Sequence, residues 1–337
     1  MEHINIRGLA KELNLSIGTV SKALRDSHEI SAQTKKRVRA LAHRFHYTPN
    51  PYASSLRRKK SNTIAVVVPE VADSFFSLAI KGIEEIAQSK GYHVLIYLTY
   101  ESYLKEINIL DDFKNGRVDG VILSISSETS AIHHFEELSS KNIPLVFFDR
   151  VAEEIKTAKI TTDDFEAGYK SALHLVERGC KRISFLAISK FLSISNKRME
   201  GYMEALKKHN MEIDKFSVIY CSNDPEHNYN LITKALKKRK RPDGIIASVE
   251  KLITPVYMVC KDLNIHIPSK VKVLCFSNLP AAQILSPTLT TITQPAFEMG
   301  KAAATVLFKA LEKRNYNWKN ENIIIPSELI ERESTGR

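Results

Sequence analysis

The residues from Ser16 to Lys22 combine side chains that proteins use to read duplex DNA. Lys22 can donate hydrogen bonds to guanine O6 and N7, and Ile17 can contact the methyl group of thymine. Gly18 has no side chain and allows a close approach to base edges. Residues of these types are often plain surface, but their spacing on one predicted helix favours base contacts by Ile17, Gly18 and Lys22.

Three short helices are expected to position these side chains. Asn5, Ser16 and Ser31 are typical N-cap residues, and each precedes apolar residues at helical spacing. The apolar positions are Ile6, Leu9, Ala10 and Leu13 in the first helix, Val20, Ala23 and Leu24 in the second, and Val38, Leu41 and Phe45 in the third. The first two helices are close enough to form a helix-turn-helix, whose second helix enters the major groove.

Polar and basic residues nearby are suited to phosphate oxygens. The candidates for phosphate contacts are Ser16, Thr19, Ser21, Ser31, Thr34 and Asn50. Residues 1–60 hold 13 Lys and Arg against 4 Asp and Glu, a net charge of +9, whereas residues 61–337 carry only +2. On the third helix, Lys35, Lys36, Arg37 and Arg39 are expected to be exposed. A solvated basic surface is the alternative, but a basic excess confined to one end favours a polyanionic partner such as operator DNA.

Three segments of this region resemble the DNA-binding end of the lactose-repressor (LacI/GalR) family. They are Ser16 to Leu24, Ile30 to Thr34 and Tyr47 to Leu56. The resemblance implies that Ile17, Gly18 and Lys22 occupy the base-reading positions. Lys22 and Arg25 replace the arginine and asparagine that are usual in the family, so DNA binding is expected while the operator sequence stays open.

The resemblance also implies a hinge helix from Asn50 to Arg58 that becomes ordered on DNA. The residues fit this role, because Asn50 can cap a helix and Pro51 suits its first position. Minor-groove contacts are expected from Ala53, Leu56 and Arg57, with Leu56 as a wedge between base steps. A basic, flexible linker is the alternative for residues 50–60, and we expect it in the absence of DNA.

From Thr63 the sequence changes to short apolar runs that alternate with amphipathic segments. Strands are predicted at 64–68, 94–98, 118–123 and 145–148, with helices at 76–90 and 103–113. Further strands are predicted at 183–188, 216–220, 244–247 and 271–276. The segments Arg117 to Ser124 and Arg241 to Ser248 are similar, which indicates two similar lobes with parallel sheets.

Two such lobes form a cleft beside the carboxyl ends of their strands, where open α/β folds bind small ligands. The segments Gly82 to Glu85 and Leu289 to Pro295 extend the family resemblance across this region. The resemblance implies a fold like that of periplasmic sugar-binding proteins. The effector-binding residues that it implies are Phe75, Phe76, Asp149, Arg198, Glu250 and Ser277.

Two of these positions depart from the family pattern. Ser277 stands where the family commonly has an aspartate, which typically accepts hydrogen bonds from a sugar or purine. Glu250 departs from the usual asparagine-aspartate pair. Both departures argue against an ordinary sugar, so the identity of the effector, a sugar-like or other small metabolite, stays open. The alternative for Phe75 and Phe76 is core packing, and for Asp149 it is capping of the following turn.

Other chemistries have little support in the sequence. Cys180, Cys221, Cys260 and Cys275 are scattered, so we expect buried thiols without a metal site, a cofactor or a disulfide framework. The sequence contains no Gly-rich phosphate loop and no catalytic constellation, so no enzyme activity is expected. The chain has neither an export signal nor a long apolar span, which predicts a cytoplasmic protein without a membrane partner.

These features predict a small all-α helix-turn-helix domain in residues 1–48, a hinge helix or linker in 49–61, and an α/β core in 62–337. The core is expected to resemble a periplasmic binding protein with two doubly wound parallel-sheet lobes. Its N-lobe is expected at about 62–161 plus 292–320, and its C-lobe at about 162–291 plus 321–337.

The predicted function is that of a transcription regulator, a repressor that binds a palindromic operator as a homodimer under the control of a small-molecule effector. One alternative is a solute-binding protein of a transport system, and another is an α/β hydrolase or sugar-processing enzyme. The missing export signal and the basic helical domain argue against the first. The missing catalytic groups argue against the second.

Overall fold

The chain forms two compact units, residues 1–61 and residues 62–337. The computed structural model describes residues 4–47, 60–215, 217–313 and 315–336. The first unit has a small helical core, and the second contains larger apolar clusters on both faces of two sheets.

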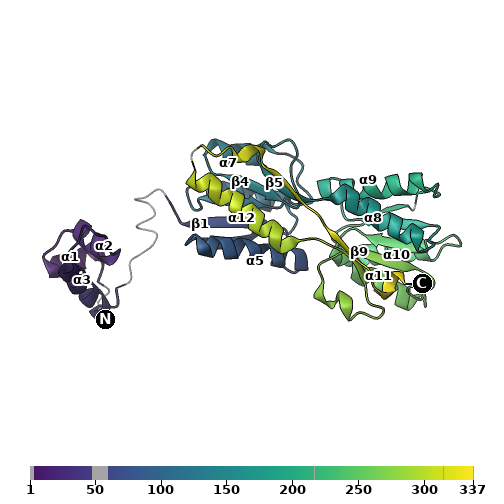
Figure 1. Ribbon diagram of the computed structural model, residues 1–337, viewed down its shortest axis with the longest axis horizontal. Coiled ribbons are helices and arrows are strands. Elements are labelled where there is room, and N and C mark those ends of the chain that lie inside the picture. The colour runs from purple at the N-terminus through teal and green to yellow at the C-terminus, as the bar shows by residue number, and fades with distance from the viewer. Residues whose placement is uncertain (1–3, 48–59, 216, 314, 337) are drawn as a thin grey trace. The chain divides into compact units, whose positions relative to one another are not determined.

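The N-terminal unit contains three short helices. They are α1 (Ile6–Leu13), α2 (Ile17–Leu24) and α3 (Ala32–Arg44) (Figure 1). Each begins after a predicted N-cap: the side chains of Asn5, Ser16 and Ser31 accept hydrogen bonds of 3.0, 3.0 and 3.3 Å from the backbone N–H three residues later. The buried core consists of Leu9, Ala10, Val20, Ala23, Val38 and Ala42. The predicted helix-turn-helix and third helix are confirmed.

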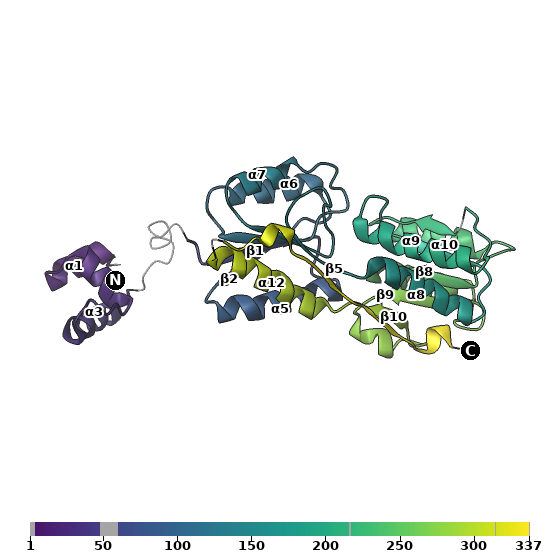
Figure 2. The same cartoon turned by 45° about the horizontal axis from the view of Figure 1, so that its top comes forward.

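The N-lobe of the second unit is built on a parallel sheet with the strand order β11-β5-β4-β3-β1-β2. Its strands are β1 (Thr63–Val68), β2 (His93–Leu98), β3 (Gly120–Leu123), β4 (Leu145–Phe148), β5 (Ala158–Thr162) and β11 (Asn322–Ile325). Helices α5 (Ser74–Ser89) and α12 (Ala296–Glu312) cover one face (Figure 2). The other face packs against α6 (Tyr103–Phe113) and α7 (His133–Ser140).

The C-lobe repeats this design with the strand order β12-β10-β9-β8-β6-β7. Its strands are β6 (Ile183–Ala187), β7 (Val218–Tyr220), β8 (Gly244–Ala247), β9 (Lys272–Phe276), β10 (Thr290–Thr293) and β12 (Glu328–Ile330). The covering helices are α8 (Asp164–Glu177) and α9 (Ser193–Lys208) on one face, and α10 (Pro225–Leu236) and α11 (Ile253–Asp262) on the other. Strand β12 runs antiparallel to β10. The shared strand order confirms the two similar lobes.

The chain crosses between the lobes after β5, after β10 and after β11, and these positions differ from the predicted lobe boundaries. The N-lobe sheet includes Thr162 and Asn322–Ile325, whereas Thr290–Thr293 belongs to the C-lobe sheet. The approximate boundaries expected at 161/162 and 291/292 differ from the observed crossings by one or two residues, whereas the boundary expected at 320/321 is wrong because β11 belongs to the N-lobe sheet. The largest error concerns β11, which is placed by its long-range parallel pairing with β5 and has no strong local signal of its own.

The remaining predicted elements correspond to observed ones with small shifts at their ends. Helix α5 begins two residues earlier than expected, because the Asp73 side chain caps it by accepting a hydrogen bond of 2.8 Å from the Phe75 N–H. Strand β3 begins at Gly120 instead of residue 118. Strand β7 begins at Val218, and residue 216, where it was expected to start, lies outside the described residues.

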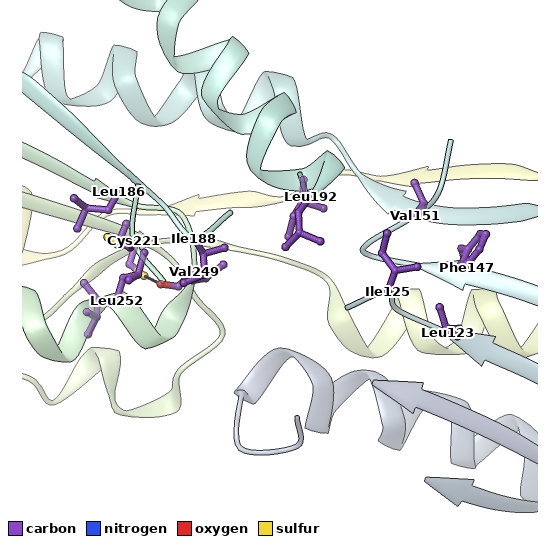
Figure 3. Close-up of a cluster of buried hydrophobic side chains, with 14 of the residues drawn as sticks. Leu123, Ile125, Phe147, Val151, Leu186, Ile188, Leu192, Cys221, Val249 and Leu252 are labelled. Atoms are coloured by element: carbon purple, nitrogen blue, oxygen red, sulfur yellow. Dashed lines mark hydrogen bonds between the residues drawn. The ribbon is translucent and has the colours of Figure 1, made fainter. Parts of the chain in front are cut away.

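An apolar cluster connects the lobes near their junction (Figure 3). Ile125 and Val151 belong to the N-lobe side of this cluster, and Ile188 and Val249 to the C-lobe side. Leu192, the residue before α9, lies between the two groups and is 1% exposed. The lobes are therefore held together by apolar packing as well as by polar contacts.

The four cysteines are free thiols buried in the C-lobe, as expected. Burial raises the pKa of Cys180 and Cys221 to about 12, so both thiols stay protonated at neutral pH. Within the described ranges, no cluster of three or more His, Cys, Asp and Glu residues is arranged to hold a metal ion. Among the described residues, no helix has the length and apolar character needed to span a membrane.

Candidate functional site

The outer side of α2 carries the predicted base-reading residues. Val20 and Ala23 are buried in the helical core, which leaves Ile17 and Lys22 exposed. Ile17 is 44% exposed at the start of the helix, where a large apolar side chain is suited to a thymine methyl group. The space beside Gly18 is open, because an added Cβ would meet only the Ser16 Oγ at 3.6 Å. Packing within this unit therefore does not require a glycine at position 18.

Lys22 forms an ion pair with Glu29 on the surface of this unit. The hydrogen bond and charge of the Lys22 ammonium lower the pKa of the Glu29 carboxyl. Exposed ion pairs contribute little to stability, because water screens them and their side chains lose entropy. Lys22 can therefore exchange its ion pair with Glu29 for a hydrogen bond to a base edge at a small cost in free energy.

Hydroxyl groups expected to contact phosphates gather at two helix starts. The Oγ of Ser16 lies 2.9 Å from the Oγ1 of Thr19 at the start of α2. The same arrangement, also at 2.9 Å, joins Ser31 and Thr34 at the start of α3. Helix N-termini present N–H donors and the positive end of the helix dipole, so both arrangements fit a phosphate oxygen.

Arg25 is a further candidate for DNA contact, which sequence reasoning noted only as a departure from the family pattern. Its guanidinium donates hydrogen bonds of 3.1 Å to the Ser21 carbonyl and 3.2 Å to the Ser21 hydroxyl. This contact places a guanidinium beside an expected phosphate contact. The spacing of four residues between Ser21 and Arg25 was the signal that could have identified the pair.

One expectation about the basic face of α3 is wrong. Lys35 was expected to be exposed, but its side chain is only 19% exposed because the ammonium contacts the Asp26 carboxylate at 3.1 Å. Arg39 contacts the same carboxylate at 2.7 Å and is exposed. Asp26, which lies beyond the predicted helix, therefore neutralises part of the basic face.

The predicted hinge contacts lie outside the residues that the structure describes. These are Ala53, Leu56 and Arg57 in the minor groove and Asn50 at a phosphate. Their roles stay predictions.

A small cavity lies between the N-lobe and the C-lobe. Its volume of about 20 Å³ leaves room for about one water molecule. It is lined by Asp73, Phe75, Phe76, Asp149, Arg150, Ile194, Arg198, Val249, Glu250, Phe276, Ser277, Asn278 and Gln294. The structure thus brings the six predicted effector-binding residues to one site. A larger ligand needs more space than this arrangement of the lobes and lining side chains provides.

The ends of parallel strands determine which side chains reach this cavity. Asp149 follows β4 and Ser277 follows β9, while Glu250 lies three residues after β8. Because carboxyl ends of parallel strands meet at one edge of a sheet, residues that follow them converge on the cavity. Asp149 has a φ of 59°, an uncommon backbone conformation for a residue other than glycine.

Phe75 and Phe76 pack in the N-lobe core and also line the cavity. Their rings pack against Phe148, with centroids 6.4 and 6.2 Å away, and both belong to the N-lobe core. Phe75 is 6% and Phe76 is 2% exposed, yet both line the cavity. They therefore form an apolar wall whose position is set by core packing.

Arg198 is buried at the other side of the cavity. Its Nε donates a hydrogen bond of 2.8 Å to Asp164, and its Nη1 donates one of 2.7 Å to the Ser248 carbonyl. The guanidinium carbon lies 4.3 Å from the centroid of the Phe276 ring. The buried Nη2 has no hydrogen-bond partner among the described residues. An unpaired buried donor is costly, so this atom is suited to an oxygen of a ligand.

Sequence reasoning missed several lining residues, of which Arg150 has the strongest interactions. Its Nη1 donates hydrogen bonds of 3.0 and 2.8 Å to the two carboxylate oxygens of Glu101, and both side chains are buried. Its Nε has no hydrogen-bond partner in the described part of the chain. A charged residue directly after the apolar run of β4 was the available signal. The other missed residues are Asp73, Ile194, Val249, Phe276, Asn278 and Gln294.

Glu250 connects the two lobes across the cavity. One carboxylate oxygen accepts hydrogen bonds from the Ser74 hydroxyl at 2.9 Å and the Ser74 N–H at 3.3 Å. The other accepts one of 2.8 Å from the Ser277 hydroxyl. Ser74 belongs to the N-lobe and Ser277 to the C-lobe. The two departures from the family pattern, at 250 and 277, thus act together in one hydrogen-bonded group.

Two carboxyl groups of the cavity have raised pKa values. Burial raises the pKa of Asp149 to about 6, against the opposing charges of Arg150 and Arg198. Burial and then the charge of Glu250 raise the pKa of Asp73 to about 6. Ionised carboxylates are disfavoured where water is excluded, so both groups take up protons more readily here than in water.

Replacing Asp149 by asparagine is expected to stabilise the protein at pH 8 by about 2–3 kcal/mol and to have little effect at pH 4. Folding raises the pKa of this carboxyl from 3.8 to about 6, so the folded state binds its proton more tightly. Ionisation therefore costs folded-state stability as the pH rises from about 4 to 6. Urea denaturation followed by the fluorescence of Trp318, the single tryptophan, measures the difference. Asp112→Asn, at an exposed carboxyl, is the control, and equal effects of Asp149→Asn at both pH values would contradict the expectation.

Two family models match the chain. The model described as "Bacterial regulatory proteins, lacI family" matches residues 5–50. The model described as "Periplasmic binding proteins and sugar binding domain of LacI family" matches residues 61–333, which is well over half of the chain.

Similar proteins match along most of the length. The HTH-type transcriptional regulator RegA of Clostridium saccharobutylicum is 28% identical over 332 residues, which cover 98% of this chain and 99% of RegA. The crystal structure of the Lac repressor dimer bound to operator and the anti-inducer ONPF has a TM-score of 0.84 at 18% identity and covers 99% of both chains. A LacI family regulator from Enterococcus faecium with bound ribose has a TM-score of 0.72 at 24% identity and covers 81% of this chain and 98% of that one. These structural likenesses show the fold, and the family models show the membership. The chain belongs to the LacI family of bacterial regulatory proteins.

Proposed function

We propose that the chain is a repressor that binds a palindromic operator as a homodimer and responds to a small molecule in the cleft between the lobes. The observation that carries this proposal is the outer side of α2, where exposed Ile17 and Lys22 stand on a basic helical unit. The RegA relative is named as a transcriptional regulator, and the Lac repressor neighbour is a dimer bound to operator. The protein acts in the cytoplasm, where its operator lies, and has no catalytic role.

In this proposal α2 enters the major groove. Ile17, Gly18 and Lys22 read bases, and the hydroxyls at the starts of α2 and α3 contact phosphates together with Ser21. The hinge from Asn50 to Arg58 orders on DNA, with Leu56 in the minor groove. Phosphate contacts supply affinity and base contacts supply specificity.

An exposed edge of the N-lobe supports the proposed homodimer. Strand β2 lies at one edge of the sheet, and its Leu95 and Ile96 are 37% and 46% exposed. Tyr100 and Leu104 follow in the chain and are exposed as well. Sheet edges with apolar side chains readily pair with another chain, and here we propose a second copy. Sedimentation of the purified protein measures its mass directly.

The cleft supports control by an effector. A ligand that favours one arrangement of the lobes shifts the equilibrium between arrangements by its difference in affinity for them. A change in that arrangement is passed to the hinge and alters DNA affinity. The E. faecium neighbour holds ribose. For this chain we propose a sugar-like or other small metabolite that contacts Phe75, Phe76, Asp149, Arg198, Glu250 and Ser277.

A gel-shift titration on the DNA upstream of the protein's own gene tests the proposal. We expect binding that is tighter than to unrelated DNA and that weakens steeply as the salt concentration rises, because bound phosphates release counterions. Absent binding, or binding that does not depend on salt, would remove the regulator function.

Replacing Lys22 by alanine is expected to lower the preference for the operator over variants by at least about tenfold while largely keeping affinity for unrelated DNA, because Lys22 donates to a base edge. Competition gel shifts with operator variants measure the preference. Lys36→Ala is a matched control, since Lys36 is an exposed lysine on α3, outside the reading helix. Its effect should be similar on all sequences. If Lys22→Ala weakened binding to the operator and to unrelated DNA equally, Lys22 would be a phosphate contact.

A further inference from the structure

The two arginines that line the cavity are already neutralised by carboxylates of the protein. Arg150 is bound by Glu101, and Arg198 by Asp164, each at 2.8 Å. The arginine charges are therefore engaged with their own partners. They balance the other carboxylates of the cavity only in part: both arginine charges oppose the rise in the pKa of Asp149, and Arg150 also opposes the rise in the pKa of Asp73.

Asp73 and Glu250 remain without an ion-pair partner in the described part of the chain. Asp73 uses one oxygen to cap α5, and among the described residues Glu250 accepts hydrogen bonds only from Ser74 and Ser277. The two carboxylates are close enough for the charge of Glu250 to raise the pKa of Asp73 in addition to the effect of burial. Both residues line the cavity. Two neighbouring buried carboxylates without a direct ion-pair partner are costly unless a ligand supplies further positive charge.

A second, independent feature points to a ligand. Arg198 is 1% exposed and lines the same cavity, yet its Nη2 has no hydrogen-bond partner among the described residues. The buried Nε of Arg150 likewise has no hydrogen-bond partner among the described residues. These donors require oxygen acceptors. The cavity therefore combines an unbalanced negative site with unsatisfied donors and an apolar wall of phenylalanine rings.

We propose that the effector carries a primary ammonium group, which binds between Asp73 and Glu250, and oxygen acceptors, which bind Arg198. This inference rests on the proposed effector function and specifies the chemistry of that site. An ammonium group has three donors, so it bridges Asp73 of the N-lobe and Glu250 of the C-lobe. Charge-assisted hydrogen bonds are about twice as strong as neutral ones, so a neutral sugar hydroxyl replaces them poorly.

The cavity also indicates how such a ligand changes the protein. Its volume of about 20 Å³ is too small for a sugar or an amino acid, so entry requires the lobes to separate. Separation breaks the hydrogen bonds from Ser74 to Glu250. The ammonium group then takes the place of Ser74 as the link between the lobes. The bound state is accordingly a more open arrangement of the lobes.

Calorimetric titration with matched probes tests the ammonium group. The probes are D-glucosamine, N-acetyl-D-glucosamine and D-glucose for amino sugars, and L-serine and N-acetyl-L-serine for amino acids. We expect one of the two amines to bind at least tenfold more tightly than its neutral or acetylated counterparts. Binding of D-glucosamine would identify the effector class as amino sugars, and binding of L-serine would identify it as amino acids. Binding of a neutral probe as tight as that of its amine, or no binding of either amine at saturating concentration, overturns the proposal.

Variants locate the site. Asp73→Asn and Glu250→Gln are expected to weaken the binding amine at least tenfold, whereas Glu84→Gln, at an exposed carboxyl on α5, keeps wild-type affinity. Melting followed by circular dichroism shows whether each variant is folded. Unchanged affinity in folded Asp73→Asn and Glu250→Gln overturns the proposal. Operator binding by the wild-type protein is measured in parallel, so failure of the ammonium proposal is distinguished from failure of the regulator function.

Discussion

Replacing Gly168 by alanine is expected to destabilise the C-lobe by at least about 3 kcal/mol. Gly168 lies on α8 where this helix crosses α9, and an added Cβ would meet the carbonyl oxygen of Arg198 at 2.0 Å. Gly201 faces the same crossing from α9, where its Cβ would meet the Phe165 carbonyl oxygen at 1.9 Å. Backbone atoms cannot move aside as a flexible side chain can, so the two helices must separate. In a helix, alanine is more favourable than glycine by only about 1 kcal/mol. This gain is smaller than the steric cost of separating the two helices.

Thermal and urea denaturation followed by circular dichroism measure this loss. Lys170→Ala is the control, because Lys170 is exposed on the same helix and is not among its buried residues. It should leave stability within about 0.5 kcal/mol of wild type. A folded Gly168→Ala variant with wild-type stability would show that the two helices can separate at little cost.

Replacing Arg198 by alanine is expected to cost about 3–5 kcal/mol of folding free energy and to abolish the response to effector. The change leaves the Asp164 carboxylate buried, with the Thr162 hydroxyl at 3.1 Å as its one remaining side-chain hydrogen-bond partner in the described part of the chain. Burial already raises the pKa of Asp164, and the Arg198 guanidinium opposes that shift. Without the guanidinium, the folded state must either bury an unpaired charge or take up a proton.

The double variant Arg198→Met with Asp164→Asn separates the effect of the unpaired Asp164 carboxylate from the effect of lost arginine packing. It removes both charges, so we expect it to recover most of the lost stability while the effector response stays absent. Urea denaturation supplies the stability, and a gel shift with effector supplies the response. If the double variant were as unstable as Arg198→Ala, the packing of the arginine stem against its neighbours would be the cause instead of the unpaired carboxylate.

The DNA-binding unit could be predicted closely because its structure depends on short-range interactions. Asn5, Ser16 and Ser31 cap their helices through backbone groups only three residues away. Helical spacing alone separates the buried Val20 from the exposed Ile17. The error at Lys35 arose because its partner Asp26 lies outside the helix. No helical periodicity reveals such a contact.

Six of the residues that line the cavity could be predicted from the sequence, but the hydrogen bonds and ion pairs within the cavity could not. Each expected residue lies near the end of a strand or in a covering helix, so the topology carries it to the site. The partners were missed because they are distant in the chain: Arg150 binds a residue 49 positions away, and Glu250 binds one 176 positions away. Only the packing of the two lobes brings these pairs together.

The outer side of α2, with exposed Ile17 and Lys22 and half-buried Gly18, was determined by the sequence itself, as were the parallel-strand pattern and the set of predicted cleft residues. These features follow from caps, periodicity and strand ends, which are local. The tertiary structure alone decided that β11 joins the N-lobe, that Glu250 links Ser74 to Ser277, and that Asp73 and Glu250 have no ion-pair partner among the described residues. These features depend on contacts between distant segments, whose relative positions are set by packing and long-range strand pairing.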